Sequence, residues 1–121
     1  MRLGNDIAER LLSFAIEVMR VVAQLPKTRD QAARHIATQL IRSATSGGAN
    51  YEEARAAESR DNFVHKVGIA AKEVRESLYW LRLIGGAGWS RVDLGPTIRE
   101  AGELAAILAA SARTARSRPR G

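Results

Sequence analysis

Apolar residues recur at steps of three and four along four separate segments of the chain. Such steps place apolar side chains on one side of an α-helix. Residues 29–57, 62–84 and 96–116 each carry a main line of this period. Residues 5–25 carry two adjacent lines: Ile7, Leu11, Phe14, Val18, Val21 and Leu25, and then Ala8, Leu12, Ala15, Met19 and Val22. The pattern predicts four helices and no strand.

Residues that interrupt or begin helices separate the four segments. Pro26 stops the first, the polar cluster 58–61 ends the second, and the glycines of 85–88 end the third. Pro96 suits the first turn of the fourth helix. Short connections between amphipathic helices favour an all-α protein, an antiparallel up-down-up-down four-helix bundle. We assign residues 1–112 to the bundle and residues 113–121 to a basic C-terminal tail.

Small side chains dominate the middle of the second predicted helix. Gly47 and Gly48 are adjacent there, and each glycine costs a helix about 1 kcal/mol relative to alanine. Close approach of another helix is the usual compensation. Beside them runs a polar stripe consisting of Gln39, Arg42, Ser43, Ser46, Asn50 and Glu53, with Glu73 or Glu76 of the third helix as ion-pair partners for the arginine. We interpret this stripe as structural or as a subunit contact, and the alternative is a binding site.

The third predicted helix has more apolar surface than one buried face requires. Beside its main stripe it carries Ile69, Trp80 and Leu83 on another side. A helix with a second apolar line has a second packing surface. We therefore predict that these three residues contribute to an interface between copies of the chain.

The formal charge of +6 is concentrated at the C-terminus. Four arginines without an acid lie in the last nine residues: Arg113, Arg116, Arg118 and Arg120. They are either a solvated end that complements the negative end of the last helix, or a contact for nucleic acid. The rest of the chain carries only about +2, since four of the six excess charges lie in this segment.

With these residues identified, the chain resembles the bacterial four-helix-bundle proteins related to those encoded in intervening sequences of large-subunit ribosomal RNA genes. The resemblance rests on residues 25–84, above all on Leu25-Pro26-Lys27, Gly48-Ala49-Asn50-Tyr51, and Glu73 through Trp80-Leu81. The chain is also similar to a related branch, the accessory variability proteins of diversity-generating retroelements. The resemblance implies a ring of five subunits with a basic surface for nucleic acid and a reverse transcriptase.

Arg60 and His65 provide an alternative to this interpretation. An arginine, four residues and a histidine resemble the signature of the helical HEPN ribonucleases, in which the pair acts on the 2′-hydroxyl and the scissile phosphate. Histidine transfers protons near neutral pH and arginine holds phosphate. The chain has many arginines, however, so the spacing also arises by chance.

Other chemistries lack the residues they need. The chain has no cysteine, which excludes disulfides and thiol catalysis and fits a cytoplasmic location. No acid–histidine cluster has metal-ligand spacing, the glycines of 85–88 lack the lysine of a phosphate-binding loop, and no apolar run approaches the roughly 20 residues of a membrane span. We expect no cofactor, no metal and no membrane partner.

Three functional hypotheses remain. The first is a non-enzymatic homo-oligomer, a pentamer by the resemblance, that binds nucleic acid or a nucleic-acid enzyme. The second is a small ribonuclease that uses Arg60 and His65. The third is a purely structural oligomer.

Overall fold

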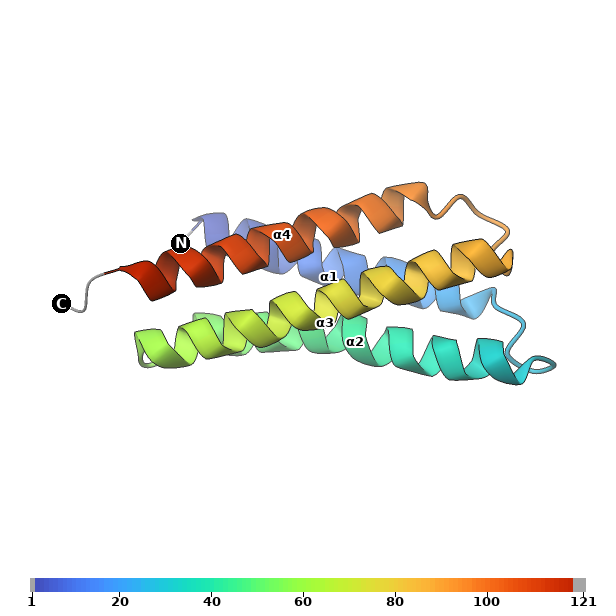
Figure 1. The fold of residues 1–121 in the computed structure, drawn as a ribbon, viewed down its shortest axis with the longest axis horizontal. Helices are drawn as coiled ribbons and strands as arrows, with labels where there is room; N and C mark the ends of the chain where they lie inside the picture. Colours follow the sequence, from blue (N-terminus) through green and yellow to red (C-terminus); the bar gives the residue numbers. More distant parts are fainter. Residues whose placement is uncertain (1, 119–121) are drawn as a thin grey trace.

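Four long helices make up the protein, and the computed structural model describes residues 2–118 of it. They are α1 (Arg2–Ala23), α2 (Gln31–Arg55), α3 (Arg60–Ala87) and α4 (Gly95–Ser117). Successive helices run in opposite directions along the long axis (Figure 1). The described part of the chain contains no strand. The prediction of an all-α four-helix bundle is therefore confirmed.

Side-chain caps define where two of the helices begin. The Asp30 carboxylate accepts a hydrogen bond of 3.0 Å from the backbone N–H of Ala33 at the start of α2. The Ser59 hydroxyl accepts one of 3.1 Å from the N–H of Asn62 at the start of α3. Aspartate and serine are favoured at this position, because their oxygens satisfy N–H groups that have no partner within the helix.

The end of α3 corrects one sequence prediction. The helix was predicted to end at Ile84, but it continues to Ala87, with Gly85 and Gly86 inside it. Gly88 alone leaves the helix, with a left-handed φ of 72°. Glycine lowers helix stability without terminating a helix, and only one residue has to adopt the left-handed conformation.

The ends of α1 also differ slightly from the prediction. The helix begins before residue 5, where it was predicted to start, and the Asn5 side chain accepts a hydrogen bond from Arg55 of α2. The helix ends at Ala23, two residues before the predicted Leu25. Hydrogen bonds from the N–H of Gln24 to Val21 and of Leu25 to Val22 tighten the chain there, before Pro26 stops it.

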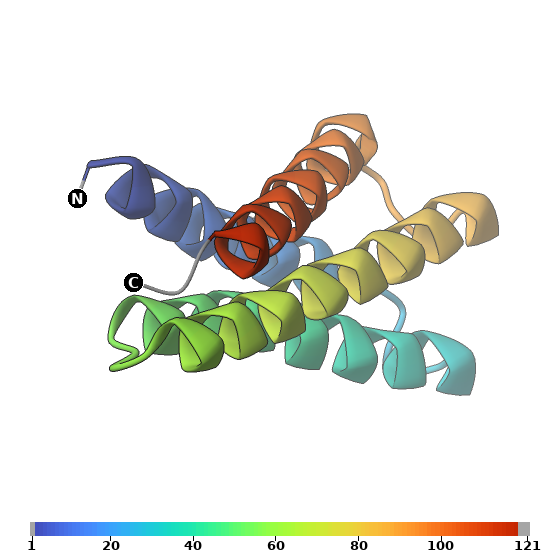
Figure 2. The same ribbon diagram turned by 60° about the vertical axis from the view of Figure 1, so that its left-hand side comes forward.

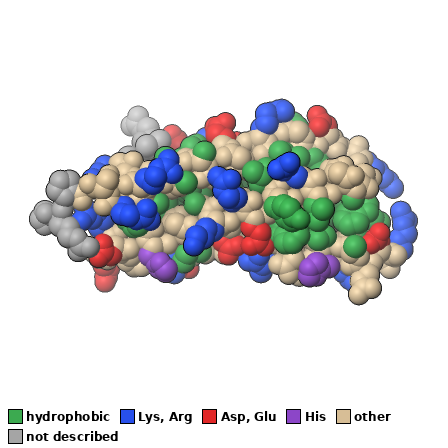
Figure 3. Space-filling view, viewed as in Figure 1, with side chains coloured by type: hydrophobic (Ala, Val, Ile, Leu, Met, Phe, Trp, Pro, Cys, Tyr) green, Lys and Arg blue, Asp and Glu red, His purple; other side chains and the backbone are tan. Residues whose placement is uncertain are grey.

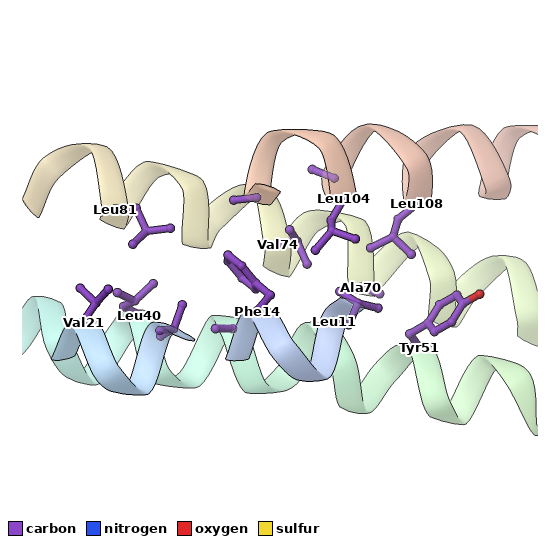
Figure 4. Packing of buried hydrophobic residues seen from close by; sticks show 14 of the residues in the cluster. Leu11, Phe14, Val21, Leu40, Tyr51, Ala70, Val74, Leu81, Leu104 and Leu108 are labelled. Carbon is purple, nitrogen blue, oxygen red and sulfur yellow. The ribbon is translucent and has the colours of Figure 1, made fainter. Parts of the chain in front are cut away.

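The core lies along the axis between the four helices. Figure 4 shows apolar side chains from all four pointing toward one another, among them Leu11, Leu40, Val74 and Leu104. Each of these is buried. Burying a side chain of this size stabilises the fold by about 1.5–3 kcal/mol. The core thus comes from the main apolar line of each helix, whereas Leu12 and Met19 of the second predicted line on α1 are exposed.

The helices occupy the corners of a square in which α1 and α3 lie diagonally opposite each other. α2 and α4 each pack against both of them. The pair α2 and α3 runs side by side, whereas α1 and α4 diverge (Figure 2). Arg10 of α1 bridges the wider gap by donating hydrogen bonds to Glu100 (2.8 Å) and Glu103 (2.7 Å) of α4. These bonds hold the pKa of Arg10 above its ordinary value.

The closeness of α2 and α3 depends on Gly47. A Cβ atom at this position would lie 2.8 Å from Cγ2 of Val74, which is inside van der Waals contact. The neighbouring Gly48 faces α1 instead, where a Cβ would lie 3.7 Å from Cβ of Leu11. Close helix packing therefore requires glycine at the first position and tolerates a methyl group at the second.

Candidate nucleic-acid interface

The acidic residues in the middle of α3 face α2. Arg42 of α2 donates a hydrogen bond of 3.1 Å to Glu73 and another to Glu76. Ser46 also donates to Glu73 (3.2 Å), and the indole N–H of Trp80 donates to Glu76 (2.9 Å). Burial raises the pKa of Glu76, but the bonds from Trp80 and Arg42 outweigh it, so the pKa lies below its ordinary value. The pKa of Arg42 is raised above its ordinary value, most by its hydrogen bond to Glu76 and next by its hydrogen bond to Glu73.

The remaining polar stripe of α2 lies along the same seam. The hydroxyls of Ser43 and Ser77, both fully buried, are 2.7 Å apart. Further pairs extend the seam: Gln39 accepts from Arg42, Asn50 donates to the carbonyl of Ser46, and Glu53 pairs with Lys66 at 2.7 Å. Within the described residues, no buried side-chain nitrogen or oxygen lacks a hydrogen-bond partner. The structure gives these polar groups partners within the subunit.

The outer surface of α3 is cationic because its acids face α2. Lys72, Arg75, Tyr79 and Arg82 follow one another at steps of 3, 4 and 3, and all four are exposed. We call these four residues the cationic α3 line. Between Asn62 and Ala87 the acids of the helix are Glu73 and Glu76, which bind Arg42.

At its N-terminal end the cationic α3 line leads into a hollow of about 550 Å³ between α3 and α4. We call it the basic pocket, after five of the residues that line it: Arg60, His65, Lys72, Arg116 and Arg118. Asp61, Val64 and Gly68 complete its lining. Arg60 donates a hydrogen bond to the backbone carbonyl of Arg118, which ties the start of α3 to the end of α4.

The surface of the molecule is divided into a cationic half and a more hydrophobic half on the face that carries α3 and α4. In Figure 3 Lys and Arg side chains gather over the half where α3 begins and α4 ends, and hydrophobic side chains gather over the half where α3 ends. Four cationic side chains and one carboxylate line the basic pocket. Such a concentration of positive charge in a hollow attracts anions, and arginine suits phosphate in particular.

The pocket joins two predictions that the sequence kept separate. α4 continues to Ser117, so Arg113 and Arg116 belong to the helix and Arg118 follows it directly, while Arg120 lies outside the described residues. Arg116 and Arg118 line the same hollow as Arg60 and His65.

Sequence reasoning missed Lys72, Arg75, Tyr79 and Arg82 as a group. Their helical spacing on the side opposite the apolar stripe was the available signal.

The predicted interface residues differ in exposure. Ile69 and Trp80 are half-buried, and Leu83 is exposed. A more exposed apolar line lies on α1, where Leu12 (55%), Ile16 (41%) and Met19 (56%) are separated by four and three residues. We call these three residues the α1 apolar line. Two of them, Leu12 and Met19, belong to the second row that the sequence pattern assigned to the buried stripe.

Other kinds of site find no support in residues 2–118. No three histidine, aspartate or glutamate side chains among them gather as a metal site requires. None of the four helices combines the length and the apolar composition that crossing a bilayer requires.

Comparisons with known proteins agree with this architecture. Residues 4–110 match the family model of the 23S rRNA-intervening sequence protein. A crystal structure of a protein of unknown function from the S23 ribosomal protein family of Bacteroides thetaiotaomicron superposes with a TM-score of 0.79 at 29% identity, covering 91% of this chain and 97% of the other. No curated protein matches the chain. Because the family model spans most of its length, the chain belongs to the 23S rRNA-intervening sequence protein family.

Proposed function

We propose that this protein is a non-enzymatic, homo-oligomeric helical scaffold that binds nucleic acid through the basic pocket and the cationic α3 line. The observation that carries the proposal is the pocket itself. It brings Arg60 and Lys72 of α3 together with Arg116, which comes from α4, a distant part of the sequence. The name of the family, which refers to ribosomal RNA, is consistent with a nucleic-acid ligand.

The expected mode of binding is electrostatic. Arginine and lysine contact backbone phosphates without reading the base sequence, and they release counterions when they do so. Of the acids on α3, Glu73 and Glu76 are paired with Arg42 of α2, and Asp61 is outnumbered in the pocket lining by four cationic side chains. Binding is therefore expected to be sequence-independent and to weaken steeply with salt.

Self-association is the second part of the proposal. The α1 apolar line is exposed in the single subunit, and a contiguous apolar line of this kind marks a protein contact. Because α1 lies diagonally opposite α3, association through α1 leaves the cationic α3 line accessible. Several copies would act together on one nucleic-acid chain, or on a reverse transcriptase bound to it, and avidity would strengthen a modest single-site affinity. Five copies is the number that the family resemblance implies.

The proposal is tested by removing charge from the pocket. A Lys72→Ala, Arg116→Ala double variant is compared with Arg20→Ala, Arg29→Ala, which loses the same net charge at exposed positions of α1 and its following connection. Fluorescence anisotropy with a labelled 20-nucleotide strand is followed from low to moderate salt. We expect the pocket variant to reduce the slope of log K against log salt by about 1.4, since each lost contact to a single strand contributes about 0.7.

The control variant should leave both the affinity and the slope close to those of the wild type. Absence of binding by the wild-type protein at low salt would contradict the proposal. Equal losses of affinity and of salt slope in the two double variants would show that binding depends on net charge and not on the pocket.

The ribonuclease remains a second candidate, favoured by one observation. Arg60 and His65 line the same hollow, so both would contact an RNA strand bound there. His65 would accept the proton of the 2′-hydroxyl as its oxygen attacks the phosphate held by Arg60; the bond from phosphorus to the 5′-oxygen would break, leaving a 2′,3′-cyclic phosphate and a 5′-hydroxyl protonated from solvent. Cleavage of a labelled RNA by the wild type that disappears in His65→Ala, with RNA affinity retained, would establish this activity. Intact RNA after prolonged incubation would exclude it under those conditions.

A further inference from the structure

We infer that the cationic α3 line takes single-stranded nucleic acid, with Tyr79 stacking against an unpaired base. The inference rests on the proposed function and specifies its ligand. It starts from an aromatic residue in an unusual place, since Tyr79 is 59% exposed in the middle of a line of cations. The core does not need this side chain, and its neighbours on the line are polar.

The ring of Tyr79 has a defined support. It meets the ring of Trp80 edge-on, with centroids 5.2 Å apart and an angle of 69° between the planes. Trp80 is itself held by the hydrogen bond of its indole N–H to Glu76 (2.9 Å), which binds Arg42 of α2. Tyr79 therefore packs against an aromatic side chain that is itself held in place by a hydrogen bond. Such an arrangement limits the conformational entropy that binding would cost.

Cationic side chains lie on both sides of this ring. Arg75 is four residues before Tyr79 and Arg82 three residues after it, so each lies about one helical turn away on the same outer surface. A nucleotide in a strand has a phosphate on either side of its base. The tyrosine between two arginines therefore matches a base between two phosphates, the combination that single-strand binding proteins use.

The cationic α3 line is longer than one nucleotide requires. From Lys72 to Arg82 the line spans roughly 15 Å at 1.5 Å per residue. Lys72 also lines the basic pocket, which continues the positive surface toward Arg60 and Arg116. A strand of several nucleotides can therefore contact cations along its whole backbone.

A duplex matches the same surface less well. Its bases are already paired and stacked inside the helix, so Tyr79 would have no base face to contact. The arginines would still reach duplex phosphates, so weaker electrostatic binding would remain. The two ligand classes can thus be distinguished: single strands would contact both the Tyr79 ring and the cationic side chains, and duplexes would contact the cationic side chains alone.

The test uses the full-length protein with a 20-nucleotide single strand, a 20-base-pair duplex, and a single strand that contains 2-aminopurine. The variants are Tyr79→Leu, Tyr79→Phe, and Leu83→Ala as a control that removes a neighbouring exposed apolar side chain. We expect Tyr79→Leu to weaken single-strand binding on the order of tenfold and to leave the salt slope and duplex binding unchanged. Tyr79→Phe should keep the affinity, and 2-aminopurine fluorescence should be quenched by the wild type and Tyr79→Phe only.

Three outcomes would overturn the inference in different ways. If the wild type binds single strand and duplex equally and Tyr79→Leu changes neither, while Lys72→Ala, Arg116→Ala still weakens both, the proposed function holds and the stacking role fails. If Leu83→Ala weakens single-strand binding as much as Tyr79→Leu, the exposed apolar side chains of α3 contribute general contact and no base stacking. Absence of any binding at low salt would remove both proposals.

Discussion

The outer surfaces of α1 and α3 occupy opposite corners of the bundle and differ in chemistry. Each carries exposed side chains at helical spacing, apolar on α1 (Leu12, Ile16 and Met19) and mainly cationic on α3 (Lys72, Arg75 and Arg82). The outward-facing side of a helix in a four-helix bundle contacts neither neighbouring helix, so the fold does not dictate its chemistry. The difference indicates two separate surfaces for two kinds of partner.

The two corners also differ in how their helices are held. α3 packs closely on α2 through Gly47 and shares with it the ion pairs of Glu73 and Glu76. α1 diverges from α4 and is joined to it by Arg10. A partner that covers the α1 apolar line would therefore stabilise the more loosely packed side of the bundle, whereas the cationic surface stands on the closely packed side.

The largest expected effect concerns association through α1. In the Leu12→Glu, Met19→Glu double variant two exposed apolar side chains become charged, and burying those charges in an interface is costly. We expect the dissociation constant of the oligomer to rise by at least about 100-fold, because each change is expected to cost more than about 1.4 kcal/mol. Light scattering at micromolar concentration measures the change, and circular dichroism should show an unchanged helix content.

Leu83→Glu is the matched variant at the opposite corner. It introduces one charge at the exposed end of the predicted line of Ile69, Trp80 and Leu83, and we expect a smaller effect on association. Dissociation by Leu83→Glu, with no effect of the α1 variant, would place the interface on α3. A wild-type protein that is monomeric at micromolar concentration would exclude both surfaces as self-contacts under those conditions.

Much of the fold could be predicted from the sequence because helical period is a local property. The main line from Ile7 to Leu25, the break at Pro26 and the presence of a break within residues 85–88 depend only on neighbouring residues. The exposure of Leu12 and Met19 could not be predicted in this way. Periodicity shows that a stripe is broad, but which edge of it faces another helix depends on where the neighbouring helices lie.

The candidate site was predictable in parts and not as a whole. The spacing of Arg60 and His65 and the C-terminal arginines are visible in the sequence. Their meeting with Lys72 in one pocket depends on the antiparallel packing of α3 on α4, which brings the start of one helix to the end of the other. Equally, the cationic character of α3 emerges only once Glu73 and Glu76 are seen to face Arg42.

A smaller expected effect concerns α2, which separates the two corners. Gly47→Ala introduces a Cβ 2.8 Å from Cγ2 of Val74, a buried β-branched side chain that has little freedom to move. The clash should outweigh the gain in helix propensity and lower the free energy of unfolding by about 1–2 kcal/mol. Urea denaturation measures it.

Gly48→Ala is the control on the side of α2 that faces α1. Its new Cβ would make ordinary contact with Leu11 at 3.7 Å, so the propensity gain should persist and raise stability by up to about 1 kcal/mol. Equal effects of the two substitutions would contradict the difference in packing between the two sides of α2.

The smallest expected effect concerns the acids that keep the outer surface of α3 cationic. The pKa of Glu76 lies below its ordinary value of 4.5 in the folded protein, despite burial, because Trp80 and Arg42 donate hydrogen bonds to it. A lowered folded pKa contributes stability above the unfolded pKa, and this contribution is lost as the pH falls through the folded value. We therefore expect the free energy of unfolding of the wild type to decrease as the pH drops below about 4.5, and that of Glu76→Gln to decrease less steeply in this range.

At neutral pH the free energy of unfolding of Glu76→Gln should be lower than that of the wild type by less than about 1 kcal/mol, because the ion pair is partly exposed to solvent. Urea denaturation between pH 3 and 7 measures both, with Glu9→Gln on α1 as the control for removing an exposed charge. A pH profile of Glu76→Gln that is as steep as that of the wild type would show that the seam between α2 and α3 gains nothing from this ion pair.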